Sequence, residues 1–223
     1  NGDSYVPGAP GTSEIREPDV LSSYDTDSQY YKDILGFEST KAMADSMVAE
    51  YKKMSDSVKK YHGFYIGRYE LTGTTGNPTV KSGNVLTAAE AGNWYYLYEA
   101  CQNVIKNNMD VKSTMIYGCQ WDETMSWLSK NGYNTDTDSS SWGNYSKSPI
   151  NTGSVSTYKA NEIFDLAGNY CEWTQEAEIA NGRVVRGGSY ERSGSYEPAS
   201  NRSGDSAIAD YSNYSARATL YIL

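Results

Sequence analysis

The 223-residue chain has one histidine, His62, and only three cysteines, Cys101, Cys119 and Cys171. A single imidazole excludes metal sites that need two or three histidine ligands. Three widely spaced cysteines are too few for a disulfide scaffold or a zinc knuckle. One disulfide with one free thiol, or three unpaired thiols, both stay open. No apolar run approaches the roughly 20 residues of a membrane helix, which disfavours direct membrane insertion.

Basic residues are scarce as well. Lysine and arginine number 19 against 28 aspartates and glutamates, so the net charge at pH 7 is −9. A phosphate backbone needs a cationic footprint, so this balance argues against nucleic acid as a partner. It also disfavours an anionic lipid surface. No basic segment followed by an apolar one opens the chain, but it begins at Asn1, which leaves open a signal or anchor that has been removed.

Tyrosine, in contrast, is abundant, with 21 residues against three phenylalanines. Tyrosine suits positions where the ring is apolar on its body and wet at its tip. Together with serine, glycine and asparagine it is typical of binding surfaces. A β-rich core with many half-buried strands would use tyrosine too, so both readings stay open.

Hydrophobic periodicity predicts three helices. After loop-like residues 1–38, the first helix starts at Ser39 and carries a stripe that most simply faces the core: Met43, Met47, Tyr51, Met54, Val58 and Tyr61. The second starts at a capping box formed by Thr87 and Glu90. Its predicted buried face is Trp94, Leu97, Tyr98, Cys101, Val104 and Ile105. The third covers residues 119–130.

Short apolar runs predict strands in the rest of the chain, at residues 64–71, 162–166, 170–177, 183–186 and 216–223. Residues 134–157 read as a long polar loop, which in a compact domain is usually functional or mobile. Helices in the first half and short strands in the second half predict an α+β fold. The predicted division is an N-terminal arm with its amphipathic helix, residues 1–60, and a domain of residues 61–223.

Two motifs in the second half are specific. Phe164-Asp-Leu-Ala-Gly-Asn-Tyr-Cys-Glu-Trp-Thr174 is followed by Arg183-Val-Val-Arg-Gly-Gly-Ser-Tyr190. The pair resembles the signature of the formylglycine-generating enzyme (sulfatase-modifying factor) family. Looser matches are the segments 63–72, 115–122 and 215–217. The resemblance covers about residues 61–223 and implies a C-type lectin-like fold of the sulfatase-modifying type, with two to three helices, small antiparallel sheets and much irregular chain.

The residues that carry catalysis in this family are missing. Its enzyme oxidises a cysteine with a copper-binding cysteine pair that lies after the Gly-Gly-Ser motif, and residues 189–223 contain no cysteine. Serine, glutamate and arginine cannot replace thiolates as ligands of Cu(I). The related ergothioneine-type sulfoxide synthases hold iron with several histidines, which this chain lacks. We therefore expect no enzyme activity and neither copper nor iron. The alternatives are a formylglycine-generating-type oxidase of sulfatases and a structural module of a surface assembly.

Residues 189–215 consist almost entirely of Ser, Tyr, Asn, Asp, Gly, Ala, Glu and Arg. A flexible linker would hold fewer aromatic residues. The segment looks like the variable region of proteins diversified by retroelements, in which mutated adenines turn Asn codons towards Ser, Tyr, Asp, Gly and Ala. Known members carry the lectin-like fold with the varied segment at the C-terminus. An ordinary surface loop would have the same composition.

We therefore predict a receptor- or adhesin-like variable protein, displayed outside the cell on a bacterial or phage surface, that binds an unknown protein or glycan. The predicted ligand-binding residues are Tyr190, Glu191, Arg192, Ser193, Ser195, Tyr196, Glu197, Ser200, Asn201, Ser203 and Asp205. Tyr190, Arg192 and Tyr196 are the expected hot spots, because aromatic and guanidinium groups carry most interface energy.

Three further sets of residues are assigned interior roles. The tryptophans at positions 94, 121, 142 and 173 are predicted to lie in the core. Arginines 183, 186 and 217 are predicted to clamp carboxylates or carbonyls inside the fold. The resemblance implies a calcium ion held by the side chains of Asp165 and Glu172 and by the carbonyls of Gly168 and Tyr170. Oxygen ligands of this kind suit Ca²⁺. Without the resemblance, two acids seven residues apart would be read as solvated surface.

Overall fold

The computed structural model of the protein describes residues 30–177 and 182–223. Residues 1–29 and 178–181 lie outside the description, and with them most of the predicted N-terminal loop. Within residues 30–38 the prediction of a loop was wrong in part, because α2 (Tyr30–Asp33) is a short helix. The Tyr30 ring stacks on Tyr95 at 5.6 Å between ring centroids. This long-range aromatic contact supports the turn and leaves no periodic signal in the sequence.

The long amphipathic helix is α3 (Thr40–Tyr61). Ser39 is its N-cap, as predicted, and His62 ends it in the left-handed conformation with φ 60°. The predicted core face is confirmed over most of its length by the buried side chains of Met43, Met47, Tyr51 and Met54.

The second predicted helix is two helices, α4 (Ala88–Ala91) and α5 (Trp94–Gln102). The capping box at the start of α4 is confirmed. Asn93 separates the helices because its side chain accepts a hydrogen bond from the Tyr95 N–H at 3.0 Å and so caps a new N-terminus.

The predicted end of this second helix was wrong. α5 ends at Gln102, so Val104 and Ile105 do not lie on a helix face. The Ile105 N–H instead donates to the Ser113 hydroxyl at 2.9 Å, which draws the chain towards a strand. The third helix, α6 (Gly118–Lys130), matches its prediction within one residue.

A three-stranded antiparallel sheet has the order β1 (Tyr65–Ile66), β11 (Ala218–Ile222), β4 (Val111–Met115). The sequence predicted no strand at β4. The strand predicted at 64–71 is regular over two residues only, although the N–H groups of Gly67 and Leu71 still donate to carbonyls in 216–218. Only the pairing with the C-terminal strand distinguishes these segments from loops.

A four-stranded sheet has the order β10 (Tyr214–Ala216), β7 (Cys171–Ala177), β8 (Gly182–Arg186), β9 (Arg202–Ser206). β10 runs parallel to β7, and the other neighbours are antiparallel. β9 was expected to be loop, because its polar sequence has no strand periodicity. It is a strand because it pairs with the buried β8.

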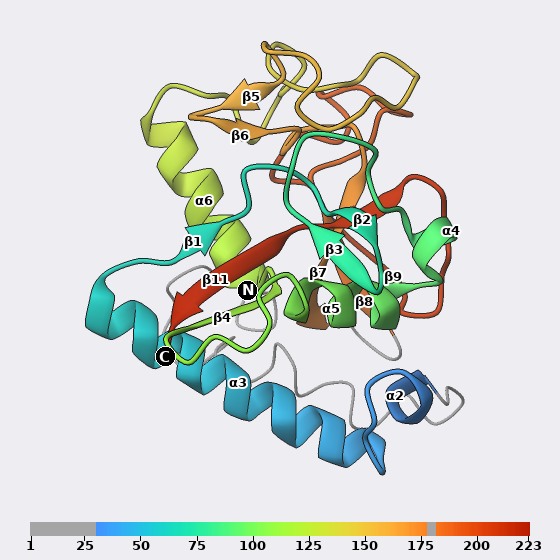
Figure 1. Ribbon diagram of the computed structural model, residues 1–223. Helices are drawn as coiled ribbons and strands as arrows, with labels where there is room; N and C mark the ends of the chain where they lie inside the picture. Colours follow the sequence, from blue (N-terminus) through green and yellow to red (C-terminus); the bar gives the residue numbers. More distant parts are fainter. Residues whose placement is uncertain (1–29, 178–181) are drawn as a thin grey trace.

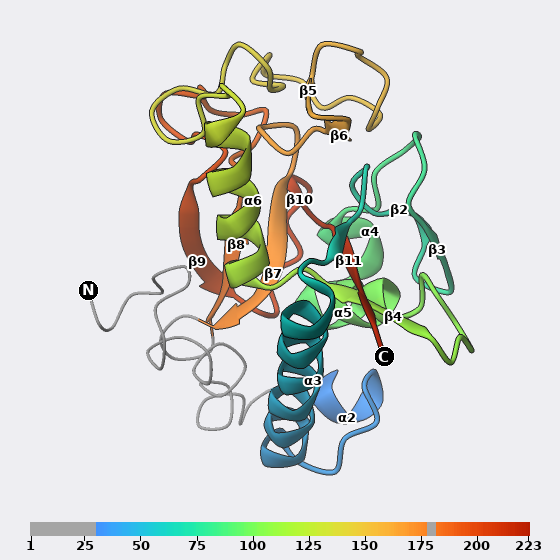
Figure 2. The same cartoon turned by 90° about the vertical axis from the view of Figure 1, so that its left-hand side faces the viewer.

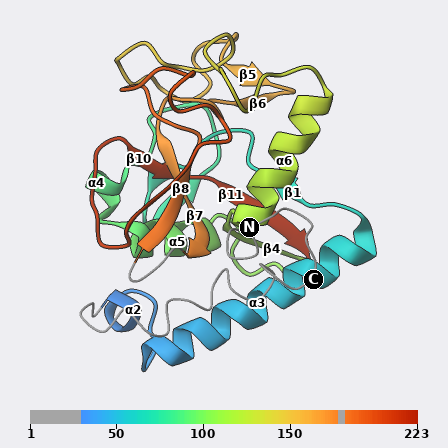
Figure 3. The ribbon, with the colours of Figure 1, turned by 180° about the vertical axis from the view of Figure 1, so that it is seen from behind.

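Two small hairpins complete the strands: β2 (Thr72–Thr74) with β3 (Asn77–Thr79), and β5 (Lys159–Ala160) with β6 (Ile163–Phe164). The four-stranded sheet and the β2–β3 hairpin lie on opposite sides of the molecule in Figure 2. α3 runs along one end, and the loops around β5 and β6 gather at the other (Figures 1 and 3). The described part of the chain, with five helices and small sheets, has an α+β fold.

The core is rich in tryptophan. The predicted core positions are confirmed, since Trp94, Trp121, Trp142 and Trp173 are all buried. Met43 and Met47 of α3 pack in the same cluster as Trp94 and Trp173. The helical part of the arm is therefore packed on the domain, while the division at residue 60 stays a prediction.

Two features of the sequence have simple structural outcomes. Cys101, Cys119 and Cys171 form no disulfide. Across the described residues, no helix has the length and apolar character needed to span a membrane.

Candidate functional site

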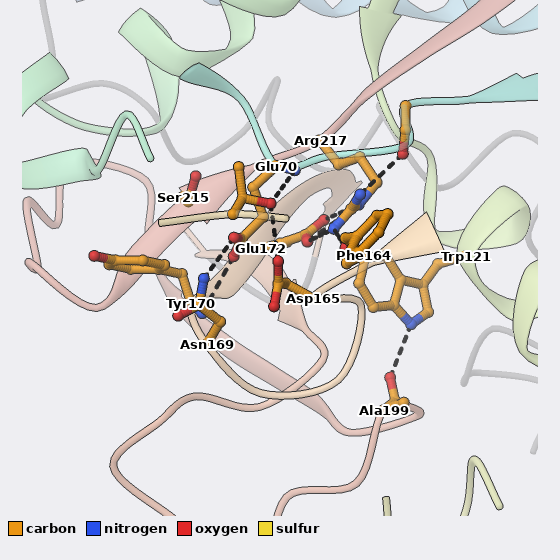
Figure 4. A network of polar contacts seen from close by, with 12 residues as sticks. Glu70, Trp121, Phe164, Asp165, Asn169, Tyr170, Glu172, Ala199, Ser215 and Arg217 are labelled. Atoms are coloured by element: carbon orange, nitrogen blue, oxygen red, sulfur yellow. Dashed lines mark hydrogen bonds and ion pairs between the residues drawn. The ribbon is translucent and has the colours of Figure 1, made fainter. Parts of the chain in front are cut away.

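The first sequence motif, residues 164–174, meets Arg217, which is fully buried (Figure 4). Its Nε lies 2.9 Å from Oε2 of Glu172, and its Nη2 lies 2.5 Å from Oε1. The guanidinium also donates to the carbonyls of Gly67 at 2.9 Å and Phe164 at 3.0 Å. Arg217 is therefore the predicted interior clamp, and it ties three distant segments together.

Two more buried carboxylates, from Glu70 and Asp165, lie beside this pair (Figure 4). Glu70 accepts from the side-chain amide of Asn169 at 2.7 Å and from the Tyr170 N–H at 3.2 Å. Oδ2 of Asp165 accepts from the Thr152 hydroxyl at 3.0 Å. Its buried Oδ1 has no hydrogen-bond partner among the described residues.

Three carboxylates thus face one guanidinium in a dry interior. Burial raises the pKa of Glu70 well above its ordinary value, and the charges of Asp165 and Glu172 add to the rise. Burial also raises the pKa values of Asp165 and Glu172. The positive charge of Arg217 opposes this rise but does not cancel it. All four side chains are at most 1% exposed. A ligand from solvent cannot reach this centre without rearrangement.

The calcium ligands implied by the resemblance come together only in part. Asp165 and Glu172 are near enough for their charges to interact. However, both oxygens of Glu172 accept from Arg217, so a cation there would face a guanidinium. The described residues contain no group of three or more histidine, cysteine or acidic side chains that could hold a metal. As they lie, these residues do not fit a calcium ion, although the unpartnered Oδ1 of Asp165 leaves calcium as a prediction still to be tested.

Gly168 and Asn169 contact the long polar loop, residues 134–157, and hold it against the first motif. Oδ1 of Asn169 accepts from the Ile150 N–H and from the Asn144 amide, both at 3.0 Å. Gly168 has φ 68°, and a Cβ there would collide with the Asn144 carbonyl, so only glycine fits. Sequence reasoning missed Glu70 and Asn144 as members of this centre. The family-like Tyr-Glu-Leu-Thr segment contained the signal for Glu70.

The predicted ligand-binding residues fall mostly in one loop between β8 and β9. Residues 190–201 form this display loop, which rests on residues 135–147. The Ser139 hydroxyl accepts from the Ala199 N–H at 2.9 Å, and the Ser140 hydroxyl accepts from the Gly194 N–H at 3.1 Å. The Tyr145 hydroxyl donates to the Glu197 carbonyl at 2.9 Å. In each bond the display loop contributes a backbone group.

The same holds at the two ends of the display loop. The Lys147 N–H donates to the Tyr190 carbonyl at 3.0 Å, and Lys147 Nζ donates to the Glu191 carbonyl at 2.5 Å. Trp121 Nε1 donates to the Ala199 carbonyl at 3.0 Å (Figure 4), and Arg186 to the Ser200 carbonyl at 2.8 Å. The frame therefore holds the loop through the loop's backbone. One loop side chain adds to this, because Oε2 of Glu197 accepts from the Ser189 N–H at 3.3 Å.

The other two predicted clamps are confirmed. Arg186, in addition to Ser200, pairs with Asp122. Arg183 donates to the Gln175 carbonyl, and its guanidinium lies 4.2 Å from the centre of the Trp94 ring. Both arginines are buried, as the prediction required.

Every predicted ligand-binding side chain is either exposed or half-buried. The exposed ones are Glu191, Arg192, Ser193, Ser195, Tyr196 and Ser203. The half-buried ones are Tyr190, Glu197, Ser200, Asn201 and Asp205. The last two residues of the set, Ser203 and Asp205, belong to β9 and not to the display loop.

Residues outside the predicted set border the same surface. The rings of Tyr170 and Tyr190 meet edge to face at 5.8 Å. The Asn213 amide donates to Oε2 of Glu191 at 3.1 Å, and the Tyr214 hydroxyl donates to Asp205 at 2.9 Å. Tyr170 was predicted only through its carbonyl, so its ring was missed. Its position in a specific motif did not reveal that the residue is only half-buried and that its ring meets Tyr190.

Comparisons with known proteins add little to this geometry. No protein-family model matches the chain, and no curated protein matches it. Among solved structures, the chain is similar to Treponema denticola variable protein 1, with 22% identity and a TM-score of 0.38. The match covers 48% of this chain and 47% of that chain, about half of each. A likeness this partial assigns neither fold nor function to this chain.

Proposed function

We propose that the protein is a non-catalytic variable protein that binds a protein or glycan ligand through the display loop and β9, on a C-type lectin-like scaffold. One observation carries the proposal. The frame holds the display loop through the loop's backbone N–H and C=O groups. Backbone groups are the same whatever the side chain, so exposed side chains can change while the loop keeps its shape.

A diversified binding surface needs this separation. Gly194 is the loop position that should not tolerate a side chain, because a Cβ there would collide with the Ser140 backbone. This close approach shows how tightly the frame packs against the loop. The neighbouring side chains are largely exposed: Tyr196 is 71% exposed, and the Arg192 side chain 60%. A tyrosine and an arginine on a preorganised loop are the side chains expected to anchor a partner.

The absence of catalysis and the location outside the cell are parts of the same proposal. Residues 189–223 contain no cysteine, and the single histidine is exposed at the end of α3, so neither a copper nor an iron site of the resembled families can form. Display on a bacterial or phage surface is inferred from the resemblance of residues 189–215 to retroelement-diversified segments.

A pair of libraries tests the proposal. The first randomises exposed positions 191, 192, 193, 195, 196 and 203, and the second randomises buried positions 189, 194 and 199 of the same region. We expect most members of the first library to fold, with melting temperatures within a few degrees of the parent, and to yield binders to a panel of purified test proteins. Most members of the second should misfold. Equal misfolding in both libraries, or no binders in the first, would reject the proposal.

A further inference from the structure

Tyr170, Tyr190, Glu191 and Asn213 form a small surface site at the base of the display loop. We infer that this site takes a cationic group, the guanidinium or ammonium of an arginine or lysine side chain on a protein partner. The inference rests on the proposed function and names the chemistry of its ligand.

The two rings are preorganised. The Tyr190 N–H donates to the Asn169 carbonyl at 2.8 Å, and the Lys147 N–H donates to the Tyr190 carbonyl, so the backbone of Tyr190 is held on both sides. The Tyr170 N–H is held by the buried Glu70. In Figure 4 the Tyr170 ring extends away from the buried carboxylates. Rings held in this way lose little entropy on binding.

A carboxylate stands beside the rings. Glu191 is exposed, and the Asn213 amide holds its Oε2 at 3.1 Å, which leaves Oε1 for a ligand. Within the described ranges Glu191 forms no ion pair. Burial raises the pKa of Tyr170 to about 12, and the charges of Glu70 and Glu90 contribute to the rise. The Tyr170 ring therefore stays neutral, and the π face of a neutral tyrosine attracts a cation.

The molecule already uses this combination for its own cations. The Arg192 guanidinium lies 5.6 Å from the centre of the Tyr196 ring and 3.6 Å from Glu197. Lys159 lies 5.4 Å from the centre of the Phe164 ring and 2.5 Å from Glu162. Over Tyr170 and Tyr190, by contrast, no cation of the described chain is seated. An aromatic pair with an unpaired carboxylate is the same arrangement without its cation.

The charge of the surrounding surface selects a basic protein over a neutral glycan. Three cations lie in this region. Arg192 pairs with Glu197, Arg202 pairs with Glu176 at 2.6 Å, and Lys147 Nζ is taken up by the Glu191 backbone carbonyl at 2.5 Å. Asp205 and Asp210, together with Glu191, form no ion pair within the described chain. The surface is therefore acidic on a chain of net charge −9, and complementary charge both steers and orients a basic partner.

The test uses three probes on the full chain: a capped Gly-Gly-Arg-Gly-Gly peptide, its citrulline counterpart, and a neutral trisaccharide. Amide resonances are followed by two-dimensional NMR. We expect the arginine peptide to shift the amides of residues 170, 190, 191 and 213 with millimolar affinity, at least tenfold tighter than the citrulline peptide. The Glu191→Gln and Tyr170→Leu variants should each weaken binding at least fivefold. Tyr65→Leu, at a 62% exposed tyrosine on β1, is the matched control and should bind unchanged.

Several results overturn the inference. Equal binding of the citrulline peptide, preferred binding of the trisaccharide, or full affinity in Glu191→Gln would each do so. So would shifts spread over acidic residues across the whole surface. If the exposed-position library gives binders but the arginine peptide does not bind, only this inference fails. If the peptide binds but the library gives none, the proposed function fails while the cation site stands.

Discussion

The buried centre around Arg217 and the display loop use hydrogen bonds in opposite ways. In the centre, side chains from four segments bond to one another, so each side chain depends on the identity of the next. In the display loop, side chains of the frame bond to the loop's backbone. In the buried centre, replacing one side chain removes a partner of the next. In the display loop, the bonds from the frame do not depend on which side chain the loop residue carries.

The largest effect is expected in the centre. Arg217→Met leaves Glu172 buried and unpaired, and breaking a buried pair costs about 3–5 kcal/mol of unfolding free energy. Urea denaturation followed by circular dichroism measures the loss. The double variant Glu172→Gln/Arg217→Met should recover part of it, because no unpaired charge remains. A loss below about 1 kcal/mol in the single variant would show that the centre does not hold the fold.

An intermediate effect is expected where the frame grips the loop. Ser139→Ala removes the acceptor of the Ala199 N–H, and an unsatisfied buried donor costs about 1–3 kcal/mol. Hydrogen exchange at residues 190–201 should accelerate by about tenfold for each 1.4 kcal/mol.

The matched control lies on the loop itself. Ser193 is exposed, and its hydroxyl contacts the Ser195 hydroxyl at 3.1 Å. Ser193→Ala should change stability by less than about 0.5 kcal/mol and leave exchange unaltered. If Ser193→Ala loosened the loop as much as Ser139→Ala, side chains and not the backbone would set its conformation.

The smallest effect is expected from calcium. Because Arg217 occupies both oxygens of Glu172, millimolar CaCl₂ or excess EDTA should move the melting temperature by less than about 1 °C. A rise of several degrees with CaCl₂, lost in Asp165→Asn, would restore the calcium site implied by the resemblance. Differential scanning calorimetry on the full chain distinguishes these outcomes.

Helix α3, the capping box at Thr87 and the buried tryptophans were predictable, because periodicity and capping are local properties of the chain. The break at Asn93 was not, since an asparagine competes with helix continuation only when the following turn is packed in place. β9 was not predicted either, because its strand geometry also depends on a contact that is distant in the sequence. Its polar residues have strand geometry only because β8 provides the pairing edge.

By itself, the sequence determined the α+β composition, the acidic charge, the buried arginines, and the concentration of tyrosine and serine near the C-terminus. These follow from residue chemistry and short-range spacing. Only the tertiary structure decided that Glu70 joins Asp165 and Glu172, that Glu172 faces Arg217 and not open space, and that residues 135–147 carry the display loop. Contacts between residues 45 to 150 positions apart depend on where the chain returns, and that is set by packing of the whole core.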